Sequence, residues 1–133
     1  MQLTLFNTQR IKRVMELQEL KAIVEEHNAM LSTGKIVDTY TKYYGENVSM
    51  QENLDAPTVG FEANLEREKA FEGSIVAVHE ITPVAVAYGE NGLVMSQWVY
   101  KFTHKEWGEV TMAQVAVQQW ENGKIVKEQF FHA

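Results

Sequence analysis

Trp120-Glu121-Asn122-Gly123-Lys124-Ile125-Val126 decides how the chain ends, because it joins two runs in which apolar and polar residues alternate. Asn122 and Gly123 both tolerate the positive φ angles of a type I′ turn, so the stretch predicts a β-hairpin. Two more alternating runs precede it, and neighbouring runs joined by short turns favour an antiparallel meander. The four predicted strands are Ile75 to Val86, Leu93 to His104, Val110 to Trp120 and Lys124 to His132.

Pro83 interrupts the first of these four runs. Proline lacks the N–H that would bond to a neighbouring strand, so it is expected at a bulge, at a sheet edge or at a break in the strand. A bent sheet is the predicted result.

The first half of the chain predicts helices. No proline or glycine interrupts residues 8–32, and apolar residues recur there at helical spacing, which indicates one long amphipathic helix. A turn at Thr33-Gly34 separates it from a shorter helix that begins at Ile36 and ends before Gly45. A third helix is predicted over roughly Glu62 to Phe71. Leu65 and Phe71 should face inward, whereas the charged residues should be mostly solvated: Glu66, Arg67, Glu68 and Lys69.

Between the second and third helices, alternation predicts a strand. Val48, Met50 and Glu52 form its core-facing row, and Asp55-Ala56-Pro57 breaks it. A carboxyl group at the end of an apolar row would be partly desolvated, which suits a general base. Glu52 is therefore a candidate catalytic residue.

Composition limits the function classes. With 133 residues and 45% apolar content, the chain has material for one buried core, which predicts a single domain. A net charge of -6 would repel phosphate backbones and anionic lipids, so neither nucleic acid nor a membrane is an expected partner. The chain has no cysteine and opens without a secretory signal, so a cytoplasmic protein is expected.

Neither a metal nor a cofactor is expected. The four histidines stand far apart in the sequence: His27, His79, His104 and His132. Gly89, Gly92 and Gly123 lie in predicted hairpin turns rather than between a strand and a helix, so they form no phosphate-binding loop.

Several motifs together resemble the SnoaL-like branch of the nuclear transport factor 2-like superfamily. They are the helix-glycine-helix opening, the strand entry YYGENVSMQEN (43–53), the helix after APTVG (56–60) and the closing WENGKIV (120–126). The resemblance implies an α+β fold, a cone-shaped barrel in which three helices from the N-terminal half pack on a curved, mainly antiparallel sheet. It begins at about residue 16, so residues 1–133 form one SnoaL-like domain with residues 1–15 as an N-terminal helical extension.

The resemblance also implies a pocket between the helices and the concave sheet face. Ketosteroid isomerase, one member of the superfamily, uses a helical tyrosine, a carboxylate base and an aspartic acid. These positions correspond here to His27, Glu52 and Val115, so His27 would be the hydrogen-bond donor, Glu52 the base, and the second donor would be missing. Glu128, Phe130 and His132 share one strand face. The expected ligand-pocket residues are Tyr40, Tyr44, Met50, Trp98, Val115, Val117, Glu128, Phe130 and His132.

Members of the superfamily often dimerise through the outer sheet face, so a homodimer is expected. Large side chains such as Trp98 or Trp120, alongside Gln114 and Gln118, are predicted on that face. The turns of the first helix around residues 11–15 are also expected to pack on the partner.

Two functions fit these patterns. The first is an isomerase, cyclase or dehydratase that binds a small, mostly apolar, carbonyl-bearing molecule and transfers protons with Glu52 and His27. The alternative is a non-catalytic dimerising or ligand-binding module whose pocket is vestigial. The sequence names no substrate.

Overall fold

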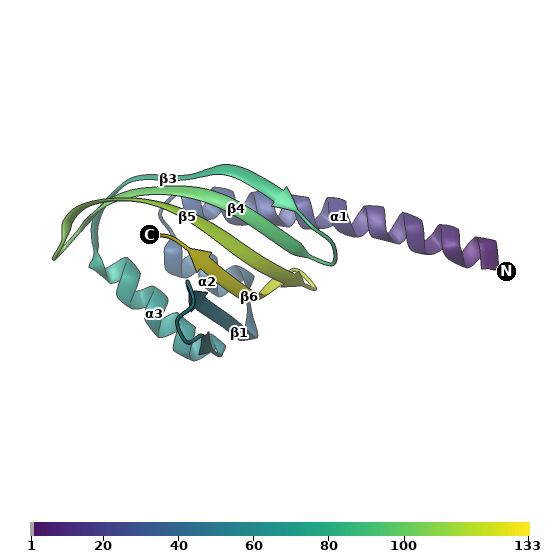
Figure 1. The fold of residues 1–133 in the computed structure, drawn as a ribbon, viewed down its shortest axis with the longest axis horizontal. Coiled ribbons are helices and arrows are strands. Elements are labelled where there is room, and N and C mark those ends of the chain that lie inside the picture. Colours follow the sequence, from purple (N-terminus) through teal and green to yellow (C-terminus); the bar gives the residue numbers. More distant parts are fainter. Residues whose placement is uncertain (1) are drawn as a thin grey trace.

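Three helices pack on the concave face of a curved sheet in this computed structural model, and the first helix extends beyond the sheet (Figure 1). The structure describes the backbone of residues 2–133 and the side chains of residues 16–133. The helices are α1 (Gln2–Ser32), α2 (Ile36–Tyr43) and α3 (Phe61–Ser74). The strands are β1 (Tyr44–Glu52), β2 (Thr58–Val59), β3 (Ile75–Tyr88), β4 (Leu93–His104), β5 (Gly108–Glu121) and β6 (Lys124–Phe131). The side chains predicted to pack on a partner around residues 11–15 lie outside the described ones.

The six strands form one sheet in the order β2-β1-β6-β5-β4-β3. The last four strands pair as the predicted antiparallel meander, with Asn122 and Gly123 in positive-φ conformations at the β5–β6 turn. β1 pairs parallel with β6, so the sheet is mixed but mostly antiparallel. Because β2 and β3 remain as edges, the sheet curves around the helices without closing.

Pro83 lies on the edge strand β3, where the register with β4 shifts between Pro83 and Ala85. An edge strand and a bulge are the two places that tolerate the missing N–H, so the prediction for Pro83 is confirmed. Two further register shifts interrupt β3, and such irregularities bend a strand and increase its twist. They account for the concave shape that surrounds the candidate site.

The face prediction for the sheet is wrong. Trp98, Trp120, Gln114 and Gln118 are all buried on the concave side, where their relative exposures lie between 1% and 8%. Alternation identifies the residues that share a face, but it does not say which face the helices cover. The outer face instead carries smaller side chains at half-exposed and exposed positions.

Gly92 is expected to tolerate no side chain. It has φ +81°, and a Cβ built there would lie 2.3 Å from the carbonyl oxygen of Trp120. Gly123 has a similar φ of +77°, but its Cβ would meet nothing nearer than 3.7 Å. Gly123→Ala should therefore cost about 1–2 kcal/mol of unfolding free energy from backbone strain alone, whereas Gly92→Ala should cost at least about 2 kcal/mol more. Urea unfolding measures both, and equal losses would contradict the predicted clash.

Candidate functional site

A cavity of about 330 Å³ lies between the helices and the concave sheet face. Its volume is at the lower end of the range for small-molecule sites. Most of the wall is apolar, with Leu31, Met50, Phe71, Trp98, Met112 and Phe130 among the lining residues. Ionisable groups are concentrated in the same space: Glu52, Arg67, Glu68, Glu128 and His132.

The structure brings most of the predicted site residues to this cavity. His27, Tyr40, Tyr44, Met50, Glu52, Trp98, Glu128, Phe130 and His132 all line it. It does not bring Val115 or Val117, because both point to the outer face of β5 and Val115 is 39% exposed. Their neighbours Gln114, Ala116 and Gln118 face the cavity instead. A shift of one residue reverses the face of every side chain in a strand.

Gln114 supplies a polar group next to Val115, where the sequence predicted that the second hydrogen-bond donor is missing. Its side chain is buried at 8% exposure, lines the cavity and has no hydrogen-bond partner among the described residues. An amide with no protein partner at the cavity wall is free to exchange hydrogen bonds with a ligand. The strand therefore presents a polar group to the cavity, although the outward valine suggested none.

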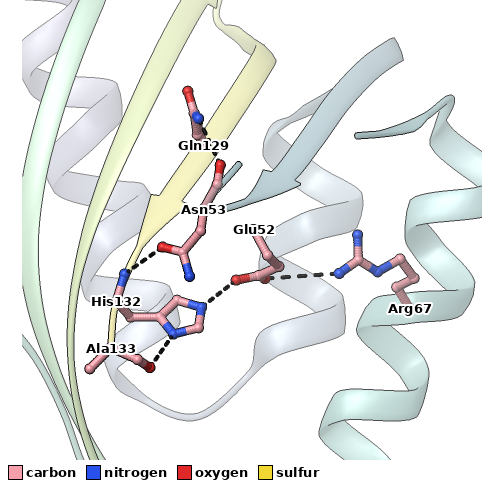
Figure 2. Close-up of polar contacts among 6 residues, drawn as sticks. All are labelled: Glu52, Asn53, Arg67, Gln129, His132 and Ala133. Carbon is pink, nitrogen blue, oxygen red and sulfur yellow. Dashed lines mark hydrogen bonds and ion pairs between the residues drawn. The ribbon is translucent and has the colours of Figure 1, made fainter. Parts of the chain in front are cut away.

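Glu52 and His132 form an ion pair at the cavity, although 80 positions separate them in the chain (Figure 2). Glu52 ends β1, and its Oε2 lies 2.7 Å from Nε2 of His132. Oε1 of Glu52 lies 3.9 Å from Arg67 on α3. The carboxyl group is half-exposed, at 36%, so it is less desolvated than the sequence predicts. Its hydrogen bond is the main cause that raises the pKa of His132.

Asn53 fixes His132 in place (Figure 2). Its Oδ1 accepts the backbone N–H of His132 at 3.0 Å, and its carbonyl oxygen accepts from Gln129 at 2.8 Å. The backbone N–H of Asn53 donates to Phe130 at 2.7 Å. Asn53 has φ +47°, a conformation that asparagine adopts more readily than most residues. These bonds hold the end of the chain against the strand that carries Glu52.

Glu68 is the functional candidate that the sequence interpretation missed. It is half-buried, lines the cavity and has no hydrogen-bond partner in the described part of the chain. Desolvation, followed by the charge of Glu128, raises the pKa of Glu68 to about 8 despite the opposing effect of Arg67. A helical signal was present, because Asn64, Glu68 and Phe71 lie four and three residues apart, on one face of α3. Phe71 correctly predicted the inward face, and Glu68 shares it.

Glu128 is the second desolvated carboxyl group, at 2% exposure. The hydroxyl of Tyr44 donates to its Oε1, and the amide of Gln118 donates to its Oε2 at 2.6 Å. Burial raises the pKa of Glu128 to about 7, although both hydrogen bonds favour the charged form and limit the rise. The cavity therefore holds two carboxyl groups, Glu68 and Glu128, whose pKa values lie close to neutral pH.

His27 is buried at 1% exposure, and burial lowers its pKa. Nδ1 lies 2.8 Å from Oδ1 of Asn28, an acceptor, which assigns the proton of the neutral ring to Nδ1. Nε2 then carries a lone pair and finds no partner among the described side chains. In this tautomer His27 accepts rather than donates, which is opposite to the role that the resemblance implies.

Two further findings bear on cofactors and membranes. In the described part of the chain, no group of three or more His, Cys, Asp or Glu side chains is arranged to hold a metal ion. Among the same residues, no helix combines the length and the apolar character needed to cross a membrane.

Comparisons with known proteins define the fold. The sequence matches no protein-family profile and no curated protein. A provisionally named SnoaL-like polyketide cyclase from Mesorhizobium loti is 22% identical, with 83% of this chain and 96% of that chain covered and a TM-score of 0.70. The epoxide hydrolase/cyclase-like enzyme SalBIII, described in pyran ring formation in the polyether salinomycin, is 20% identical, with 87% and 92% covered and a TM-score of 0.74. A provisionally named isomerase from Bacillus subtilis is 14% identical, with 89% and 88% covered and a TM-score of 0.73.

Other similar structures are named NTF2-like proteins or proteins with a ketosteroid isomerase-like fold. The chain has this SnoaL-like, NTF2-like α+β cone fold, as its sequence motifs suggested. The fold hosts several activities, so the function of this chain depends on the residues of its site.

Proposed function

We propose that the cavity binds a small, mostly apolar, carbonyl-bearing molecule and catalyses proton transfer at the carbon next to the carbonyl group. One observation carries the proposal: Glu68, a carboxyl group that keeps its proton at neutral pH, shares an apolar cavity with the carboxylate of the Glu52–His132 pair. An acid and a base of this kind in one cavity suit bifunctional proton transfer. Similar structures named as an isomerase and as cyclases support the general class.

The two carboxyl groups have different roles in this proposal. Glu52 takes a proton from the carbon, and the electron pair of the broken C–H bond moves into the enol system and onto the carbonyl oxygen. Glu68 donates its hydrogen bond, and then its proton, to that oxygen. Return of the proton from Glu52 to the same carbon, and of the enol proton to Glu68, restores the ketone and gives exchange, whereas delivery of the proton to another carbon gives an isomer. Glu68 replaces His27 as the donor, because the contact of Nδ1 with Oδ1 of Asn28 favours the tautomer in which Nε2 of His27 carries no proton.

The alternative remains a non-catalytic binding or dimerising module. A pocket packed solid with side chains would favour it, whereas the structure contains an open cavity. The remaining alternative is thus a module that binds a ketone without exchanging its protons. Experiments must separate this binding from catalysis.

A crystal soaked with the bicyclic ketone 2-tetralone tests the binding step. The proposal predicts ordered density in the cavity, with the carbonyl oxygen about 3 Å from the carboxyl group of Glu68. The adjacent carbon should face Glu52. Density elsewhere, or an empty cavity in a well-soaked crystal, would contradict the proposed binding.

The protein is also expected to be a homodimer through the outer sheet face. Exposed apolar side chains lie there on three neighbouring strands: Met95 on β4, Val115 on β5 and Phe131 on β6. Light scattering should give about twice the 15.2 kDa mass of one chain, and Val115→Lys should halve that mass. Val59→Lys, on edge strand β2, is the control. A wild-type mass of 15.2 kDa at micromolar concentration would disprove the dimer.

A further inference from the structure

We propose that the ligand of this cavity carries a positively charged nitrogen, which Glu128 holds among the rings of Tyr44, Trp98 and Tyr100. This inference rests on the proposed function only in placing the ligand in the same cavity, and it adds the chemical class of that ligand.

The charges around Glu128 favour a cation. Glu52 at the end of β1 and Glu68 on α3 both face the cavity that Glu128 lines from β6. The positive groups at this cavity, Arg67 and His132, are both close to Glu52. Glu128 accepts hydrogen bonds from Tyr44 and Gln118, which are neutral donors, and has no ion-pair partner among the described residues. A buried carboxylate without a counter-ion is costly, and a cationic ligand would provide one.

The aromatic walls supply a second, independent indication of a ligand. Tyr100 is buried at 8% exposure, yet its hydroxyl group has no hydrogen-bond partner in the described part of the chain. Its ring stacks on Trp98 with centroids 5.9 Å apart, and both rings line the cavity. Burial, followed by the charge of Glu128, raises the pKa of the Tyr100 hydroxyl. Electron-rich ring faces beside a carboxylate suit an alkylated ammonium group.

The two desolvated carboxyl groups have different roles: Glu128 binds the cation, and Glu68 donates the proton. The pKa of Glu128 is about 7 and that of Glu68 about 8, partly because the charge of Glu128 acts on Glu68. A bound cation would favour ionised Glu128, and Glu128 would release its proton on binding. Glu68 would keep its proton and remain the donor that the proposed reaction needs. Neutral His27 contributes no charge of its own, whereas the Glu52–His132 contact is an ion pair only while His132 is protonated.

Choline and its neutral isostere 3,3-dimethyl-1-butanol test the inference, since they differ mainly in the charge. The chain has only three tryptophans, so few indole N–H signals need to be assigned in an NMR spectrum. Trp98 lines the cavity, and a shift of its signal during a titration reports binding there. At about pH 8 choline should bind at least about tenfold more tightly than the alcohol. At about pH 5.5, where Glu128 and Glu68 both carry a proton, the ratio should fall toward one.

Glu128→Gln should remove the preference for choline at about pH 8, while Glu66→Gln, an exposed residue of α3, should preserve it. The wild-type pH dependence gives the same test if Glu128→Gln folds poorly. Equal binding of the two probes, or no response of Trp98 to choline, would overturn the inference. Exchange of ketone protons is measured without choline, so a protein that exchanges them but shows no charge preference loses this inference alone.

Discussion

Glu52→Gln is expected to slow deuterium exchange at the carbons next to the carbonyl of 2-tetralone by about 10²-fold to 10⁴-fold, the usual contribution of a general base. Glutamine keeps the shape of the side chain but does not accept a proton at neutral pH. His132 and Arg67 remain in place, so the apolar walls should bind the ketone as before. The exchange rate in D₂O, followed by proton NMR, measures the effect.

Stability provides the control for Glu52→Gln. The carboxyl group is half-exposed and its contacts are ion pairs at 2.7 and 3.9 Å, so their loss should change the unfolding free energy by no more than about 1 kcal/mol. Glu46→Gln, an exposed position on the same strand, should leave exchange unchanged. Full exchange by a folded Glu52→Gln protein would exclude Glu52 as the base and favour the non-catalytic alternative.

Glu68→Gln is expected to stabilise the protein at high pH and to leave it unchanged at low pH. The folded-state pKa of Glu68 is about 8, above the ordinary value of 4.5. The contribution of this group to stability is therefore fully present below about pH 4.5 and is lost as pH rises through about 8. Removing the ionisable group should add about 1–3 kcal/mol at pH 9, less than the full shift implies because the side chain is only half-buried.

Urea unfolding at about pH 5 and about pH 9 measures this difference. Glu66→Gln is the matched control, because its side chain is 73% exposed on the same helix. The Glu68→Gln protein should also lose ketone exchange, since its amide donates a weaker hydrogen bond and no proton. A variant that is less stable than wild type at both pH values would show that Glu68 is ionised and satisfied in the folded protein.

Local signals were sufficient to predict most of the fold. Asn122-Gly123 fixed the final hairpin, the uninterrupted run before Thr33 indicated the long helix, and Pro83 marked an irregular edge strand. These features depend on backbone conformations that few residues allow. The parallel pairing of β1 with β6 joins segments about 80 positions apart, and no local pattern specifies it.

The site was predicted only in part, for reasons of geometry. Alternation grouped Val115 with Val117 and Gln114 with Gln118, but the covered face follows from where the helices pack. Glu68 stood among four consecutive charged residues, which concealed that it shares a helical face with Phe71. The partnership of Glu52 with His132 depends on strand pairing across the whole chain.

The pH dependence of ketone exchange by the wild-type protein tests the account most directly. After subtraction of the rate in buffer alone, exchange of 2-tetralone protons should be fastest near neutral pH. It should then fall above about pH 8 as Glu68 loses the proton that it donates to the carbonyl oxygen. A protein that causes no exchange at any pH between about 6 and 10, or whose rate stays constant through this range, would contradict the proposed pairing of Glu68 as acid with Glu52 as base.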